Sequence, residues 1–223
     1  QQPLSDDNIQ TVFNWLTRLK HSRLANVQVQ YKDDNEPALS GQYIIEQASL
    51  RFNNQQFISE ATLALPETLG NSLELSATAQ INDAVNITSW QGLLRLDEVS
   101  LGKLLKKRAY RGAKLDDGLL TATLNVQKAS QQALLAGLEL ELTDATLSSS
   151  KPDDEFTEVS LEQLMGHFQL DYADKQWQLQ GKQVQIKMAG EEWPTTFFDI
   201  KQETNGELSG KASFIRLSDI TSL

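Results

Sequence analysis

The sequence predicts a mainly β protein: a curved, open antiparallel sheet shaped as a half-pipe or groove, with one N-terminal amphipathic helix and one short internal helix. Apolar and polar residues alternate one for one in many runs, such as Leu73–Ile81 and Leu120–Gln127. Turn residues such as Asn82-Asp83 and Asn205-Gly206 separate these runs, and only two segments show helical spacing instead. Because successive side chains of a strand point to opposite faces, each run has one apolar and one polar face.

Composition limits the classes of function. The chain has 223 residues, 39% of them hydrophobic, which is enough for one large β domain with a buried core. A formal net charge of −10 argues against a nucleic-acid-binding protein, which needs a basic surface. The absence of cysteine excludes disulfides, thiolate chemistry and Cys-ligated zinc. No apolar run approaches the roughly 20 residues of a membrane-spanning helix, and we expect the chain to be a piece of a longer protein.

The first element is predicted to be an amphipathic helix over residues 6–20. Ser5 can cap its N-terminus, and Asp6 and Asp7 in the first turn face the positive end of the helix dipole. Apolar side chains fall on one face at helical spacing: Ile9, Val12, Phe13, Leu16 and Leu19. A second, shorter helix is predicted from about Leu101 to Ala109, where it interrupts the strands.

The β-rich region is predicted to extend over residues 24–218. Strands are expected near residues 24–32, 41–52, 56–65, 71–81, 88–99, 117–128, 134–147, 156–172, 175–189, 193–203 and 207–218. A faint internal repeat is also present, in which Leu50–Phe57 parallels Leu170–Trp177 at a spacing of about 120 residues. The chain is therefore interpreted as a single β-rich domain or fragment, residues 1–223, with the alternative of two similar β units at about 24–100 and 117–218.

The sequence offers little for catalysis. His21 and His167 are the only histidines, and no P-loop, Gly-x-Gly-x-x-Gly or Gly-x-Ser-x-Gly motif occurs. Acidic pairs such as Asp116-Asp117 lie in predicted turns, which favours solvated loop tips over a glycosidase pair of carboxylates. Calcium at the Asp33–Glu36 loop stays an alternative, although the Asp-x-Asp-x-Asp-Gly pattern is missing. We therefore expect a protein that is not an enzyme and has no catalytic residue, cofactor or metal.

One basic stretch stands out in an otherwise acidic chain. No acidic residue lies within this stretch. Its basic members are Lys103, Lys106, Lys107, Arg108, Arg111 and Lys114. One interpretation is a contact for anionic lipid headgroups or for an acidic partner. The other, which we favour, is a solvated helix whose charges balance the acidic pairs Asp97-Glu98 and Asp116-Asp117 on either side.

The apolar faces of the strands define the candidate site. Its lining residues are Leu73, Leu75, Leu120, Ala122, Leu124, Val126, Leu138, Leu140, Leu142, Val184, Ile186 and Met188. Most such faces form the core of a sandwich, so a closed β-sandwich is one interpretation. The scarcity of helices to cover the face, and the small number of aromatic residues on it, favour an open groove instead. The pattern alone does not decide between the two.

Two longer segments carry a family resemblance. Ser89–Leu105, a strand that ends in a short helix, resembles the corresponding segment of AsmA-like proteins. Gln176–Leu179 followed by Val184–Pro194, with its closing Gly-x-x-Trp-Pro motif, resembles a stretch of the YhdP branch of that superfamily. The resemblance covers essentially the whole chain, as a part near the amino-terminal side of a much longer protein.

The resemblance implies a non-enzymatic segment of a bacterial envelope protein that crosses the periplasm and is anchored in the inner membrane by a segment absent from this chain. Its repeating β-groove would bind phospholipid and shelter the acyl chains during lipid transport between the inner and outer membranes, in outer-membrane biogenesis. Its other expected partners are the rest of its own longer chain and envelope proteins at either membrane, and no nucleic acid. The alternative from another class is a closed β-sandwich that acts as a structural or interaction module of the envelope.

Overall fold

The computed structural model describes most of the chain. The described residues are 20–53, 55–82, 87–105, 109–110, 113–128, 134–149, 158–173, 176–202 and 206–214. The predicted helix over residues 6–20 lies outside them, except for Lys20. Four members of the basic stretch also lie outside: Lys106, Lys107, Arg108 and Arg111.

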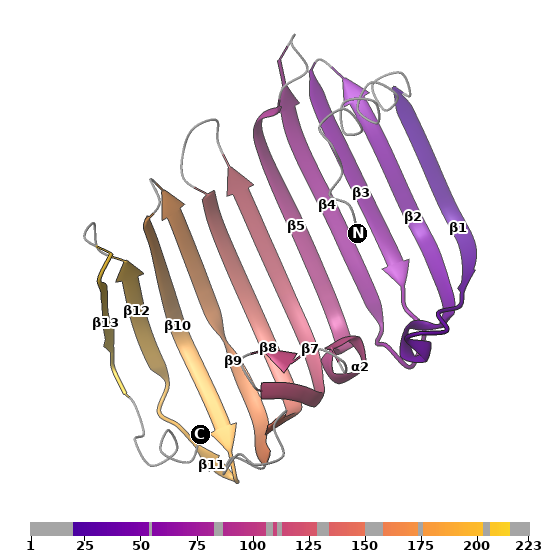
Figure 1. Cartoon of the computed structure of the whole chain (residues 1–223). Helices are drawn as coiled ribbons and strands as arrows, with labels where there is room; N and C mark the ends of the chain where they lie inside the picture. Colours follow the sequence, from indigo (N-terminus) through magenta and orange to yellow (C-terminus); the bar gives the residue numbers. More distant parts are fainter. Residues whose placement is uncertain are drawn as a thin grey trace.

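The described residues form one antiparallel sheet of thirteen strands (Figure 1). Eleven of them lie side by side in sequence order: β1 (His21–Tyr31), β2 (Gly41–Asn53), β3 (Gln56–Ala64), β4 (Ser72–Ile81), β5 (Ile87–Ser100), β7 (Ala113–Lys128), β8 (Leu134–Ser149), β9 (Glu158–Ala173), β10 (Gln176–Met188), β12 (Thr196–Gln202) and β13 (Leu208–Ala212). The short strands β6 (Ala109–Tyr110) and β11 (Glu191–Glu192) pair with β7 and β10. β1 and β13 form opposite edges and do not pair with each other, so the sheet is open.

The observed elements follow the predicted ones closely. Each of the eleven long strands coincides with a predicted strand, and the first part of the predicted internal helix is confirmed as α2 (Leu101–Leu105). The predicted end of that helix is wrong, because Ala109 lies in β6 and pairs with Lys114 of β7. The 3₁₀ helix η1 (Pro37–Leu39) and the strands β6 and β11 are absent from the prediction, because segments this short carry no periodic signal.

The strand register places apolar residues on one face of the sheet, called here the apolar face. Its central rung crosses all eleven long strands through residues directly opposite one another: Leu24, Ala48, Ala61, Leu75, Leu94, Leu124, Leu138, Phe168, Gly181, Phe198 and Ala212. No charged or hydrogen-bonding side chain interrupts this rung. The alternation seen in the sequence therefore becomes a continuous apolar surface.

The neighbouring rung lies on the opposite face, called here the polar face. Its residues are Arg23, Ser49, Glu60, Ser76, Leu93, Asn125, Gly137, Gln169, Gln180, Asp199 and Lys211. Polar and charged side chains dominate, with Leu93 and Gly137 as exceptions. The two faces thus differ in chemistry across the whole width of the sheet.

Several strands contain an irregular residue in left-handed backbone conformation. Asn26, Glu98, Asp144 and Gln183 have φ angles of 54°, 47°, 51° and 53°. The pairings shift register beside Glu98 and Gln183, as at β-bulges. Leu96 and Val99 are three positions apart in β5, yet their partners in β7, Ala122 and Leu120, are only two positions apart. The bulge therefore returns the apolar side chains to the same face after an extra residue.

The two copies of the internal repeat occupy equivalent hairpin ends. Phe52 of β2 pairs with Phe57 of β3, and Tyr172 of β9 pairs with Trp177 of β10. The two hairpins turn at the same end of the sheet, because β2 and β9 run in the same direction. The strands of both hairpins belong to one continuous sheet, and a duplication into two β units stays a prediction.

Few side chains are buried in the described part of the chain. Leu69 and Val99 are the large side chains that are fully buried, and the N–H of Ser100, just before α2, donates to the Leu69 carbonyl at 2.8 Å. Within the described residues no second sheet packs on either face, so the closed-sandwich interpretation is wrong for them.

Candidate functional site

The predicted lining residues share the apolar face. Leu75, Leu124 and Leu138 lie on its central rung; Leu73, Ala122 and Leu140 lie on the next rung; Leu120, Leu142 and Ile186 lie on the rung after that. The remaining lining residues are Val126 of β7 and Val184 and Met188 of β10. Each lies two positions along its strand from Leu124 or Ile186 and therefore on the same face. The structure therefore brings together on one surface residues that lie more than 100 positions apart in the sequence.

The exposure of these side chains shows how the apolar face is covered. Leu75 is 47% exposed and Leu24, at the β1 end of the same rung, is 53% exposed. Ala122 and Val184 are buried at 7% and 5%, between larger neighbours of the same face. The other predicted lining residues are half-buried. None of the described elements forms a layer over the central rung, where Leu24 and Leu75 are exposed and Leu94, Leu124 and Leu138 are half-buried.

Aromatic residues gather at the hairpin end of the apolar face. Phe52 pairs with Phe57, Trp90 of β5 lies opposite Ala79, and Tyr172 pairs with Trp177. The rungs nearer the middle of the strands are largely aliphatic. The central rung is therefore aliphatic from β1 to β8, whereas Phe168 of β9 and Phe198 of β12 bring aromatic rings into the middle of the face.

The apolar face is hollowed at β10, β12 and β13. This hollow, about 470 Å³ in volume, is lined by Val184, Ile186, Trp193, Thr196, Phe198, Ile200, Gly210, Lys211, Ala212 and Phe214. The rings of Trp193 and Phe214 meet edge to face, with centroids 5.9 Å apart. Phe198 lies over Gly181, where a Cβ atom would overlap its ring. Only a glycine at this position leaves room for the phenyl group.

Sequence reasoning found two residues of this apolar hollow and missed the rest. Val184 and Ile186 were predicted as lining residues, whereas Trp193, Phe198 and Phe214 were not. The alternation of Phe198 and Ile200 within a predicted strand was a usable signal. The contribution of Trp193 and Phe214 depends on how the segments beside β12 and β13 fold back.

The basic stretch is described only in part. The ammonium group of Lys103 donates a hydrogen bond to the backbone carbonyl of Thr68 at 2.6 Å. Lys114 forms an ion pair with Asp116, one of the acidic residues expected to balance the stretch. Lys114 thus has an acidic partner, whereas the hydrogen bond of Lys103 is to a backbone carbonyl, and charge balance of the stretch stays a prediction. A role in headgroup or partner contact stays a prediction.

The acidic Asp33–Glu36 loop is organised by its own backbone. The Asp33 carboxylate accepts hydrogen bonds from the N–H groups of Asn35 and Glu36 at 2.8 and 3.0 Å, as in an Asx turn. Among the described residues, no group of three or more His, Asp or Glu side chains is placed to hold a metal ion. The loop geometry is accounted for by turn formation.

Three charged groups, in two arrangements, have shifted pKa values with local causes. Glu162 accepts hydrogen bonds from the Lys187 ammonium at 2.9 Å and from the Gly190 N–H, which lower the pKa of Glu162 and raise that of Lys187. On the polar face, Gln178 donates to the Asp199 carboxylate at 2.7 Å and lowers the pKa of Asp199. Both arrangements hold carboxylates in the charged form, which suits solvated surface groups rather than proton transfer.

Comparisons with known proteins give no family assignment. No protein-family model, curated protein or solved structure matches the chain. None of the described helices is long and apolar enough to cross a membrane. The resemblance to AsmA-like proteins therefore stays a prediction from the residues quoted above.

Proposed function

We propose that the chain is a non-enzymatic lipid-binding segment whose apolar face shelters phospholipid acyl chains. The observation that carries the proposal is the central apolar rung, which crosses eleven strands and exposes about half of Leu24 and Leu75. A surface of this kind is rarely left against water in a soluble protein. It requires a covering ligand or partner.

The physics of acyl-chain binding suits a long uniform surface. Burying each CH₂ group is worth roughly 0.8 kcal/mol, and this gain has no directional requirement. Adjacent strands lie about 4.8 Å apart, so the eleven-strand rung extends over roughly 48 Å. A lipid moving along such a rung exchanges one aliphatic neighbour for another without desolvating a polar group, and the barrier to sliding stays low.

The family resemblance of the sequence suggests a cellular setting for this function. On that basis we propose that the chain is part of an AsmA-like, YhdP-branch protein in the periplasm, with an inner-membrane anchor elsewhere in a longer chain. The apolar face would form one section of a half-pipe that continues into the rest of that chain. Envelope proteins at either membrane would deliver and receive the phospholipid.

Site-specific photocrosslinking tests the proposal directly. A benzophenone amino acid at Leu124 would lie on the apolar face, and the same group at Thr123 would lie on the polar face of the same strand. Expression in a Gram-negative host, irradiation and mass spectrometry are expected to give a phospholipid adduct at position 124 and none at 123. Equal labelling, or a protein adduct alone at Leu124, would contradict lipid binding; a protein adduct would favour an interaction module instead.

A further inference from the structure

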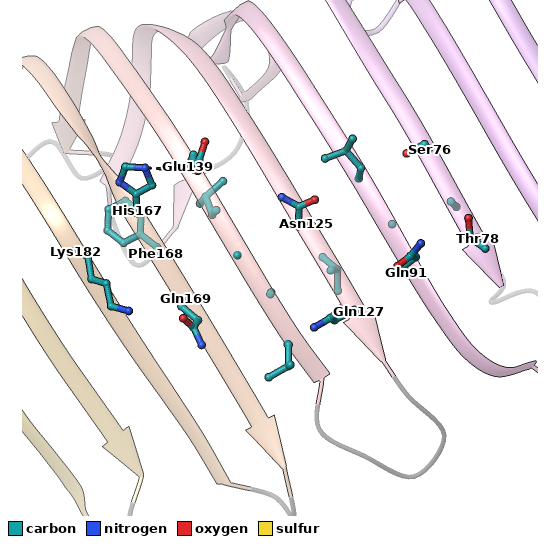
Figure 2. Close-up of a pocket in the computed structure, with 18 residues that line it drawn as sticks. Ser76, Thr78, Gln91, Asn125, Gln127, Glu139, His167, Phe168, Gln169 and Lys182 are labelled. Atoms are coloured by element: carbon teal, nitrogen blue, oxygen red, sulfur yellow. Dashed lines mark ion pairs between the residues drawn. The ribbon is translucent and has the colours of Figure 1, made fainter. Parts of the chain in front are cut away.

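A second hollow lies on the polar face of the sheet. It has a volume of about 740 Å³ and is formed by β4, β5, β7, β8, β9 and β10 (Figure 2). This volume falls within the range of small-molecule sites, roughly 300–1,000 Å³. We propose that this polar hollow is a second binding site, for a neutral oligosaccharide.

The floor of the polar hollow is Gly137. On the polar rung it lies between Asn125 of β7 and Gln169 of β9, and a Cβ atom built on it would meet no other atom within 4 Å. Its neighbours project side chains on the polar face, and Gly137 does not. The missing side chain therefore opens the space between them.

Amide groups supply hydrogen-bonding partners around this floor. Gln91 and Gln127 lie directly opposite each other, and Asn125 lies two positions before Gln127 on the same face (Figure 2). All three are exposed, and within the described residues their side chains have no hydrogen-bond partner. Each amide offers two donors and one acceptor oxygen. Such groups match the hydroxyls of a sugar, each of which both donates and accepts.

Two leucines lie among these amides on the polar face. Leu93 pairs with Asn125, and Leu135 pairs with Gln127, and both are half-buried. A pyranose ring presents hydroxyl groups at its edge and C–H groups on its faces, so it requires polar and apolar contacts side by side. Strands repeat every 4.7–4.9 Å or so, which is comparable with the length of one sugar ring. Successive rings can therefore meet successive strands.

The charges of the polar hollow favour a neutral ligand. Among its lining residues the ionisable ones are Glu139, His167 and Lys182, and Glu139 faces His167 with 3.5 Å between the carboxylate and Nε2 (Figure 2). A phosphorylated ligand would require a cluster of cations, and a basic peptide would require several carboxylates. A peptide also cannot add as a strand here, because each lining strand already pairs on both sides.

Isothermal titration calorimetry with maltotetraose, cellotetraose and chitotetraose tests the proposal on the purified chain. At least one of these probes is expected to bind. Gly137→Phe fills the hollow and is expected to weaken binding by at least about tenfold, and Gly137→Ala to leave it within about threefold. Gln127→Ala, which removes amide contacts but leaves the space, is expected to weaken binding about three- to tenfold.

Two outcomes would overturn the oligosaccharide site. One is the absence of binding by all three probes. The other is binding that both Gly137→Phe and Gln127→Ala leave unchanged. Circular dichroism and thermal unfolding check the fold, and if Gly137→Phe is unfolded, Gln127→Ala decides the matter. Photocrosslinking of lipid at Leu124, on the opposite face, is expected to be the same in the wild type and in Gly137→Phe. Failure of the oligosaccharide site is therefore distinguishable from failure of lipid binding.

Discussion

The two faces of the sheet are built by the same strands, yet they present different chemistry. Along β7, Leu124 lies on the apolar face and Asn125 on the polar face, and this alternation is repeated across the sheet. The apolar face is a long aliphatic surface with a small hollow at one end, whereas the polar face has the larger hollow near its middle. A single layer of strands can therefore carry one candidate site on each of its faces.

Glycines play different roles on the two faces. On the apolar face, Gly181 leaves room for the ring of Phe198, and the two belong to neighbouring strands. On the polar face, Gly137 leaves the space open because no neighbouring side chain enters it. The same residue type thus permits close packing on one face and an open cavity on the other.

The largest effect is expected from a charge on the apolar face. Leu124→Asp should reduce the phospholipid that co-purifies with the chain by more than about tenfold, because an ionised carboxylate is costly to bury among acyl chains. Thr123→Asp, on the polar face of the same strand, is the matched control and should leave the bound lipid unchanged. Lipid extraction followed by mass spectrometry measures the difference.

The thermal stability of Leu124→Asp distinguishes an open face from a sealed one. If the face is open, the carboxylate in the free protein is solvated, and the variant should stay folded by circular dichroism. Leu140→Asp should behave in the same way. Unfolding of both variants would show that the face is a closed core and would remove the contrast between the two faces.

A smaller effect is expected at the apolar hollow. Phe198→Ala should destabilise the chain by about 1–3 kcal/mol, below the usual cost of removing a fully buried phenyl group, because Phe198 is half-buried. Gly181→Ala should also destabilise the wild type, since its methyl group meets the Phe198 ring. In the Phe198→Ala background that cost should nearly vanish. Urea denaturation of the four proteins gives the coupling, and additive effects would contradict the predicted contact.

The bulges that keep apolar residues on one face provide the next comparison. Gln183 of β10 has a φ of 53°, so Gln183→Val should destabilise the chain by about 1–2 kcal/mol, because β-branched residues rarely adopt this conformation. Gln183→Gly should have little effect or stabilise the chain. Gln185→Val, at an exposed position on the same strand, should change stability by less than about 0.5 kcal/mol. Chemical denaturation compares the three, and equal effects of the two valine variants would argue against the bulge.

The smallest effect is expected at an exposed ion pair. Because the pKa of Glu162 is lowered in the folded chain, its contribution to stability is present above the ordinary glutamate pKa of about 4.3 and is lost as the pH falls through the lowered value. Glu162→Gln should therefore lower the melting temperature slightly at neutral pH, and the difference from the wild type should disappear in acid. Scanning calorimetry over this range makes the measurement. A difference that persists in acid would assign the effect to something other than the carboxylate.

Much of the fold could be predicted because it depends on a local pattern. The period of two in segments such as Leu120–Gln127 identifies both the strands and the side chains that share a face. The predicted lining residues accordingly lie together on the apolar face. The bulges at residues such as Glu98 and Gln183 carry no comparable signal, since a single left-handed residue can have almost any polar side chain.

The sequence by itself determined that the chain is built from amphipathic strands and which residues lie on the apolar face, because side-chain direction in a strand depends only on position along it. Only the tertiary structure decided that the sheet stays open and that Phe198 covers Gly181. It also placed Gly137 between Asn125 and Gln169 as the floor of a polar hollow. These features depend on the register between strands, which is set by backbone hydrogen bonds and bulges between segments distant in the sequence.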